Sequence, residues 1–191
     1  MKTRWMTATI VAAGVALAPA WGLAQSAPPA TDKAASDKRT GTLPSGDRKF
    51  VTEALKGGMA EVELGKLATE RASNDAVKQF GKRMADDHAK AADELKKLAQ
   101  EKGLNPPAEL DAKHAKLRDK LAKLSGAEFD RAYVNEMVKD HKKDVKEFQR
   151  EAEKAKDPDV KSFAAKTLPT LQDHLKQVED LQTQVKGTAK K

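Results

Sequence analysis

The sequence predicts an all-α protein built as a bundle of four long helices. Aromatic residues make up only 4% of its 191 residues, whereas Ala, Lys, Leu, Glu and Asp dominate, a composition that favours helices over sheets. Apolar residues recur at helical spacing in four long segments. The chain contains no cysteine, which excludes disulfide frameworks, thiolate zinc sites and cysteine nucleophiles. A β-sandwich or β-barrel is therefore not expected.

The first 24 residues predict a cleavable secretory signal peptide. Lys2 and Arg4 precede an uncharged apolar stretch, and Gly22-Leu23-Ala24 has the small residues of a cleavage site. An uncleaved membrane anchor is the alternative, although the strongly apolar part is shorter than the roughly 20 residues that a span needs. Residues 25–46 are rich in Pro, Gly and Ser and predict a flexible tether. We therefore expect a protein of the periplasm or the outer membrane.

The helical domain is expected over residues 47–186, with a basic tail at 187–191. Apolar stripes and capping residues define its helices. The predicted helices span residues 47–72, 74–102, 125–156 and 157–186. The predicted N-caps are Asp47, Ser73 or Asn74, Ser125 and Asp157.

The link between the second and third helices decides the topology. The helices within each pair are joined so tightly that each pair must form an antiparallel hairpin. Residues 103–124 instead hold a breaker and a short basic helix around 111–124, in which His114 is expected to be structural. This link is long enough to run the length of the bundle. We expect a ferritin-like arrangement of two hairpins joined by a crossover, with an up-down bundle as the alternative.

Four ionisable side chains are predicted to meet at the middle of the bundle. His88, His141 and His174 fall on the apolar stripes of their helices, and Glu61 lies on the apolar face of the first helix. Burying them without partners would cost several kcal/mol, which a shared ligand would offset. The residues predict a site for one Zn, Cu, Mn or Fe ion. The alternative is a structural polar layer whose members bond to one another.

The neighbours of these side chains allow two interpretations. Gly58 and Gly65, each about one turn from Glu61, are expected either to leave open volume or to let helices pack closely. Met84 and Met137 lie one turn from two of the histidines, as soft neighbours of a metal or as core filler. The aspartate before each of the three histidines points about 100° away, so we expect it to form ion pairs or hydrogen bonds at the rim.

Several motifs in order carry a family resemblance. They are Phe50-Val51, Gly57-Gly58-Met59-Ala60-Glu61, Met84-Ala85-Asp86-Asp87-His88, Phe129-Asp130-Arg131-Ala132-Tyr133, Asp140-His141 and Leu168-Pro169-Thr170-Leu171 with His174. Together they closely resemble an exported bacterial family, domain-of-unknown-function family 4142, over about residues 47–181. The resemblance implies a ferritin-like bundle in the cell envelope, often described as an outer-membrane protein, and no established activity.

The sequence departs from the di-iron pattern of ferritin-like proteins, which use Glu-x-x-His pairs. Ala85, Val138 and Leu171 stand three residues before the histidines. Because the bridging carboxylates are absent, the sequence predicts one bound ion rather than two.

Two function hypotheses remain. The first is a metal-binding bundle with a redox-stress role, and the second is a structural or interaction protein of the envelope whose polar layer fixes helix register. No catalytic constellation suggests an enzyme. The net charge of +7 falls by two with the signal peptide, and interleaved charges without aromatic platforms argue against nucleic-acid binding. The basic helix at 113–123 could contact anionic envelope lipids, and the chain could form a homo-oligomer.

Overall fold

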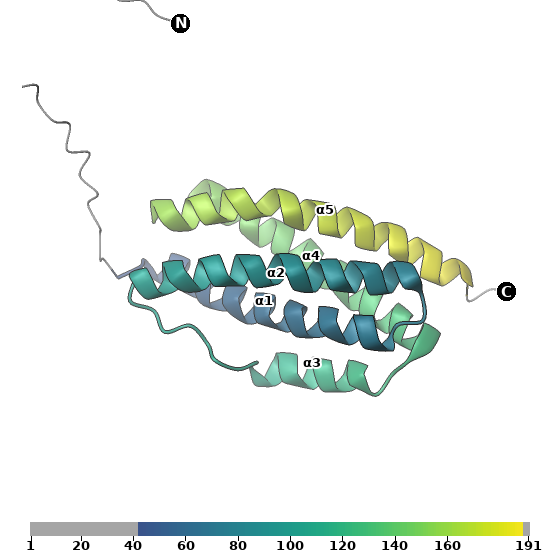
Figure 1. Cartoon of the computed structure of the whole chain (residues 1–191). Coiled ribbons are helices and arrows are strands. Elements are labelled where there is room, and N and C mark those ends of the chain that lie inside the picture. The colour runs from purple at the N-terminus through teal and green to yellow at the C-terminus, as the bar shows by residue number, and fades with distance from the viewer. Residues whose placement is uncertain (1–41, 189–191) are drawn as a thin grey trace, which may run out of the picture. The chain divides into compact units, whose positions relative to one another are not determined.

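The computed structural model describes residues 42–188, which form five helices and no strand (Figure 1). The helices are α1 (Ser45–Arg71), α2 (Asp75–Glu101), α3 (Ala112–Ala122), α4 (Gly126–Lys154) and α5 (Pro158–Thr188). The all-α prediction is confirmed. The described part has five helices rather than four because the link between α2 and α4 contains α3, where a short helix was expected. The predicted signal peptide lies outside the described residues, as do most of the tether and of the tail.

Helix starts follow the predicted caps at three of four places, and two of these caps make a side-chain hydrogen bond. The Asn74 side chain accepts hydrogen bonds from the backbone N–H groups of Ala76 and Val77, and Asp157 accepts from those of Asp159 and Val160. Ser125 occupies the N-cap position of α4 but makes no capping hydrogen bond. The prediction for α1 is wrong, because Pro44 precedes the first turn and Asp47 lies inside it.

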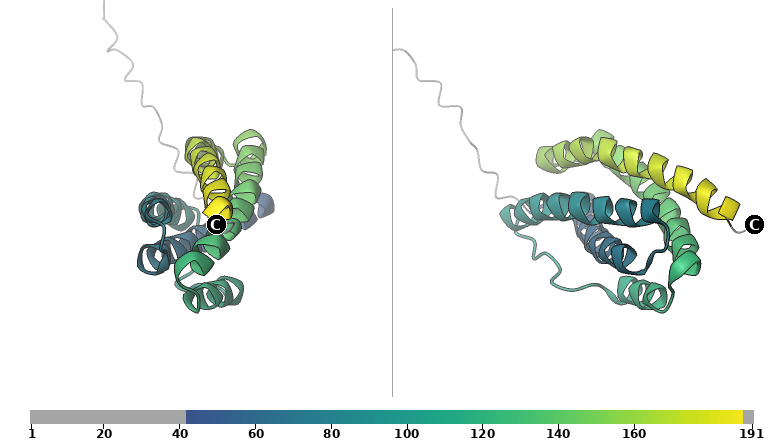
Figure 2. Two further views of the ribbon diagram at one scale, coloured as in Figure 1. Left: turned by 90° about the vertical axis from the view of Figure 1, so that its right-hand side faces the viewer. Right: turned by 45° about the vertical axis from the view of Figure 1, so that its right-hand side comes forward.

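The two helical hairpins, α1–α2 and α4–α5, pack against each other through α1 with α4 and through α2 with α5. The segment after α2 runs back along the bundle, so α4 starts at the end where α1 finishes (Figures 1 and 2). Helix α3 lies against α1 on this return path. The link is therefore a crossover, and the alternative of an up-down bundle is excluded.

Two buried aspartates connect the hairpins at their ends. Asp130, in the first turns of α4, accepts hydrogen bonds from the backbone N–H groups of Ser73 and Asn74 and from the Ser73 hydroxyl, at 2.6–3.1 Å. Asp47, in the first turn of α1, accepts from the backbone N–H groups of Lys156 and Asp157 at 3.0 and 2.6 Å. Each aspartate therefore satisfies the turn of the opposite hairpin.

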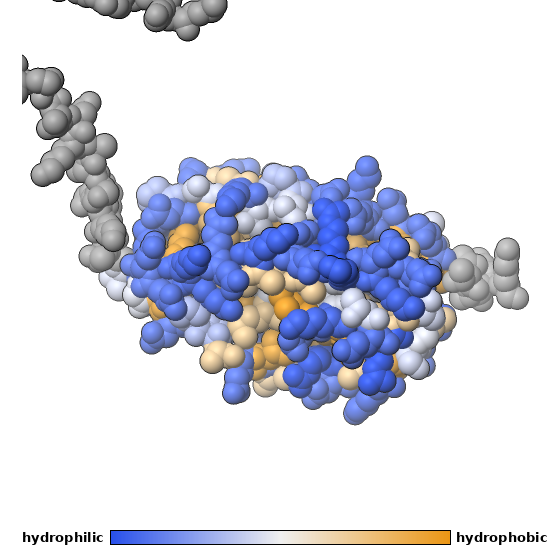
Figure 3. Space-filling view, viewed as in Figure 1, coloured by the Kyte–Doolittle hydropathy of each residue, from blue (hydrophilic) through white to orange (hydrophobic). Residues whose placement is uncertain are grey.

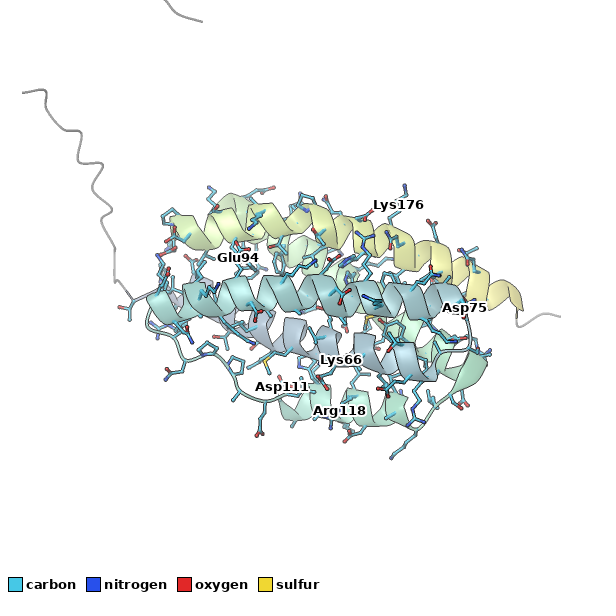
Figure 4. All side chains as sticks on the ribbon, in the orientation of Figure 1. Lys66, Asp75, Glu94, Asp111, Arg118 and Lys176 are labelled. Carbon is cyan, nitrogen blue, oxygen red and sulfur yellow. The ribbon has the colours of Figure 1, made fainter. Side chains whose placement is uncertain are left out.

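Many charged residues are exposed on the surface of the bundle. In the view of Figure 3, hydrophilic residues cover most of the face, and a small apolar area lies between α2 and α3. Lys66, Glu94 and Lys176 lie on the outer faces of their helices (Figure 4), and many exposed charges are paired, as Lys166 is with Glu94 at 2.7 Å. None of the described helices combines the length and apolar character needed to cross a membrane.

Candidate metal centre

A layer of four ionisable side chains separates two apolar clusters in the bundle core. On every long helix, one ionisable residue stands between members of the two clusters. These residues are Glu61 between Leu55 and Leu64, His88 between Met84 and Leu95, His141 between Val138 and Phe148, and His174 between Leu171 and Val178. All four residues are buried, none more than 7% exposed. The structure thus brings the four predicted residues to one level.

The three histidine rings form a nearly equilateral triangle. Their centroids are 5.7 Å apart for His88 and His141, 5.4 Å for His88 and His174, and 5.5 Å for His141 and His174. Each ring can offer one nitrogen such that all three nitrogens lie within 4.8 Å of one another. Nitrogens that share one ion at about 2 Å each lie no more than about 4 Å apart, so the three nitrogens must move closer together to hold one ion.

Each ring has an oxygen beside one nitrogen and no partner at the other. The oxygen contacts are His88 Nδ1 with Glu61 Oε2 at 3.0 Å, His141 Nδ1 with the Met137 carbonyl at 3.1 Å, and His174 Nε2 with Asp87 Oδ2 at 3.0 Å. The nitrogens without a hydrogen-bond partner among the described residues are His88 Nε2, His141 Nε2 and His174 Nδ1. The tautomer that donates its proton to this oxygen leaves the lone pair of the ring on the unpartnered nitrogen.

Burial keeps the three rings neutral. It lowers the pKa of His141 to about 4, with a further contribution from His174. It also lowers the pKa of His88 well below its ordinary value, and the two neighbouring rings add to this effect. Burial lowers the pKa of His174 as well, against the opposing hydrogen bond with Asp87. Neutral imidazole is the form that binds a metal ion.

Glu61 faces two of the three rings. Its Oε2 lies 3.0 Å from His88 Nδ1 and its Oε1 lies 3.6 Å from His141 Nδ1. Burial, followed by the charges of Asp144 and Asp140, raises the pKa of Glu61 well above its ordinary value. A carboxylate at the far nitrogen of a ligating histidine commonly fixes the orientation and tautomer of that ring. This geometry favours a supporting position for Glu61 beside the three nitrogens.

Asp87 supports the third ring, a role that the sequence analysis missed. Its Oδ2 contacts His174 Nε2 and also accepts a hydrogen bond from Arg83 Nε at 3.3 Å. Burial raises the pKa of Asp87, but the hydrogen bonds from His174 and Arg83 outweigh it and leave a net lowering. Asp87 directly precedes His88, so it leaves α2 on a different face, which meets α5. The ion pairs expected for this aspartate do form, but no sequence signal shows which helix its face meets.

The two glycines beside Glu61 have different surroundings. A Cβ atom on Gly58 would meet nothing within 4 Å, whereas one on Gly65 would lie 2.5 Å from the Gly81 carbonyl oxygen and 2.8 Å from the Ala85 nitrogen. Open volume therefore occurs at Gly58 only, and Gly65 allows α1 and α2 to pack closely.

The two methionines near the histidines belong to the apolar core. Met84 and Met137 are fully buried in one apolar cluster, as core filler would be, and their role as soft neighbours of a metal stays a prediction.

His114 lies in the first turn of α3, where its Nδ1 is 2.9 Å from Asp111 Oδ1 and its backbone N–H donates to the same atom. His114 is thus part of the start of α3 and not of the triangle.

Acidic side chains of α4 surround the approach to Glu61. Asp140 and Asp144 are half-buried and line the same pocket as Glu61 and His88. Burial raises the pKa of Asp144 to about 6, although the Lys143 ammonium lowers it. Burial also raises the pKa of Asp140. The carboxyl groups of Asp140 and Asp144 are therefore partly removed from solvent where they line this pocket.

The chain belongs to the family described as Domain of unknown function (DUF4142), whose model matches residues 30–181. Among solved structures it is similar to "Crystal structure of DUF305 fragment from Deinococcus radiodurans", with 15% identity, a TM-score of 0.65, and coverage of 75% of this chain and 99% of that chain. This similarity concerns the fold alone. No curated protein matches the chain. The family expected from the sequence motifs is confirmed, and the comparisons name no activity.

Proposed function

We propose that this member of the DUF4142 family is an exported protein of the cell envelope whose ferritin-like bundle binds one divalent transition-metal ion. The ligands are His88, His141 and His174, and Glu61 supports them or supplies a fourth ligand. One observation carries the proposal. Three buried rings each have one nitrogen fixed by an oxygen and the other nitrogen without a partner.

The energetics of the layer support a bound ion. An unsatisfied buried polar atom costs about 1–3 kcal/mol, and three such nitrogens occur within one triangle. A single ion would satisfy all three, and three neutral imidazoles suit Zn, Cu, Fe or Mn. A three-histidine set also leaves a coordination position for water or for the Glu61 carboxylate.

The architecture supports the ferritin-like class and a single ion. Two antiparallel hairpins joined by a long crossover are one of the recognised bundle topologies. Ala85 and Val138 are half-buried and buried apolar residues, and Leu171 is part of the apolar core. None of them can replace the bridging carboxylates of a di-iron site. We therefore propose no ferroxidase activity and no iron storage.

Metal analysis of the mature chain, purified without a histidine tag, tests this function. We expect one ion per chain and a rise in unfolding temperature when Zn, Cu, Mn or Fe is added to metal-free protein. A ligand at 100 times its Kd adds about 2.7 kcal/mol to the free energy of unfolding. Protein that contains no metal and gains no stability from any of the four ions contradicts the proposal. That outcome supports the alternative, an envelope interaction protein with a structural polar layer.

A further inference from the structure

We infer that a pocket lined by residues of all five described helices is the route by which the metal cation reaches the histidine triangle. This inference rests on the proposed function. The pocket has a volume of about 80 Å³, and Glu61 and His88 are among its lining residues. A cavity needs roughly 10–15 Å³ to hold one water molecule. The pocket therefore has room for several waters, as a partly hydrated cation requires.

The pocket carries a net negative charge. Its lining includes five carboxylates and two lysines: Glu53, Glu61, Asp140, Asp144, Glu147, Lys113 and Lys143. Lys143 lies 3.6 Å from Asp144 Oδ1 and 3.3 Å from Glu147 Oε2, and its side chain is 59% exposed. One exposed ammonium group is thus shared by two carboxylates, and an incoming divalent cation can displace it. A recessed surface with one sign of charge raises the local concentration of the opposite ion and its association rate.

A buried acceptor without a hydrogen-bond partner connects the pocket to the rings. Glu61 is 4% exposed, and its Oε1 atom has no hydrogen-bond partner among the described residues. The same carboxylate contacts His88 and His141 at 3.0 and 3.6 Å. A cation that reaches Glu61 from the pocket therefore lies next to two of the three rings.

Gly57 and Gly58 of α1 keep the pocket open. Both line it, and a Cβ atom at either would meet nothing within 4 Å. A large side chain at Gly58 can therefore enter open volume without displacing the backbone, and it would narrow the route. Replacing Gly58 by leucine also favours the helix, because leucine has a higher helix propensity than glycine.

The test measures the rate of metal uptake separately from affinity. Metal-free protein is mixed with Co²⁺ in a stopped-flow instrument, and the absorbance of the bound ion is followed at low and high ionic strength. We expect Gly58→Leu to slow association at least about tenfold, and Asp144→Asn/Glu147→Gln to slow it about three- to tenfold at low salt. Gly58→Leu should keep the wild-type Kd within about twofold, because a narrowed route slows association and dissociation alike. Asp144→Asn/Glu147→Gln removes charges that also attract the bound ion, so its Kd should rise by no more than the factor by which its association slows.

Matched controls isolate the pocket. Gly46→Leu makes the same substitution at another open position of α1, outside the pocket. Glu179→Gln/Asp180→Asn makes the same change in charge on the exposed face of α5. Both controls should associate at the wild-type rate.

The outcomes separate the two proposals. Wild-type protein that binds no Co²⁺ overturns the proposed function and the route with it. Wild-type protein that binds Co²⁺, with pocket variants that associate as fast as the controls, overturns the route alone. Pocket variants with unchanged association but weaker Kd place these residues in the coordination of the ion and likewise overturn the entry role.

Discussion

The hairpins α1–α2 and α4–α5 are built on the same plan but contribute differently to the site. Residues at corresponding positions are separated by one constant spacing along the chain. The pairs are Asp47 with Asp130, Phe50 with Tyr133, Val51 with Val134, Ala72 with Ala155, Asn74 with Asp157, Val77 with Val160 and Phe80 with Phe163. Members of each pair have matching structural roles. Asp47 and Asp130 satisfy the opposite turn, and Ala72 and Ala155 are the C-caps of α1 and α4.

The site breaks this correspondence. With the same spacing, His88 corresponds to Leu171, His141 to Gly58 and His174 to Ala91, while Glu61 corresponds to another acid, Asp144. The helix ends and core positions are shared because both hairpins must solve the same packing problem. At each of these three positions a histidine stands in one hairpin only, and the other hairpin has leucine, glycine or alanine there. The histidine layer is therefore not part of the plan that the two hairpins share.

The largest effect is expected when the first hairpin is given the residue of the second. His88→Leu copies into α2 the residue that α5 has at the corresponding position, Leu171. We expect the variant to keep its helical circular dichroism but to lose metal affinity by more than about 100-fold, beyond the range for supporting residues alone. Metal analysis and titration of the purified variant measure this loss. His114→Leu, outside the triangle, should bind as the wild type does, and equal losses in both variants would contradict the assignment.

The two connecting aspartates should differ in importance. Asp130→Ala removes the acceptor of three hydrogen bonds, whereas Asp47→Ala removes that of two. Because both aspartates are 3% exposed and leave backbone N–H groups without partners, we expect losses of about 3 and about 2 kcal/mol of unfolding free energy. Urea unfolding at pH 7 measures both. Equal losses would contradict the expected order of the two aspartates, and no loss in either variant would mean that these hydrogen bonds do not connect the hairpins.

Much of the fold could be predicted from the sequence, because it depends on patterns within single helices. The caps at Asn74 and Asp157 and the level of the four ionisable residues follow from spacing alone. The role of Asp47 could not be predicted, because its partners lie in the turn between α4 and α5. Asp87 was missed for the same reason, since it contacts His174 on another helix. Spacing thus identified the rings, but their partners depend on how the hairpins face each other.

Two glycines of α1, Gly58 and Gly65, should respond to alanine with opposite changes in stability. Gly65 corresponds to Phe148 of the second hairpin, and a Cβ atom there would lie 2.5 Å from the Gly81 carbonyl oxygen. We expect Gly65→Ala to destabilise the protein by about 2 kcal/mol through overpacking. Gly58→Ala should stabilise it by about 0.5–1 kcal/mol, because alanine favours the helix and meets no neighbour. Thermal and urea unfolding of metal-free protein check the signs, and destabilisation by Gly58→Ala would show that the position is not open.

The smallest effect concerns the titration of His141, whose counterpart Gly58 has no side chain. The ordinary pKa of histidine is about 6.5, and burial lowers that of folded His141 to about 4. As the pH falls from 7 to 5.5, the unfolded chain takes up a proton at His141 and the folded chain does not. The neutral ring therefore contributes stability above pH 6.5 that is progressively lost as the pH falls towards 4, about 1 kcal/mol by pH 5.5.

The difference in unfolding free energy between wild type and His141→Gln isolates this contribution, because glutamine does not titrate. Glu61 has a raised pKa and contributes with the opposite sign, but it is present in both proteins and cancels to first order. With EDTA present, the free energy of unfolding of the wild type should fall by about 1 kcal/mol relative to that of His141→Gln as the pH falls from 7 to 5.5. A constant difference would mean that folded His141 titrates with its ordinary pKa. In that case protons would compete with the metal ion for this ring near neutral pH.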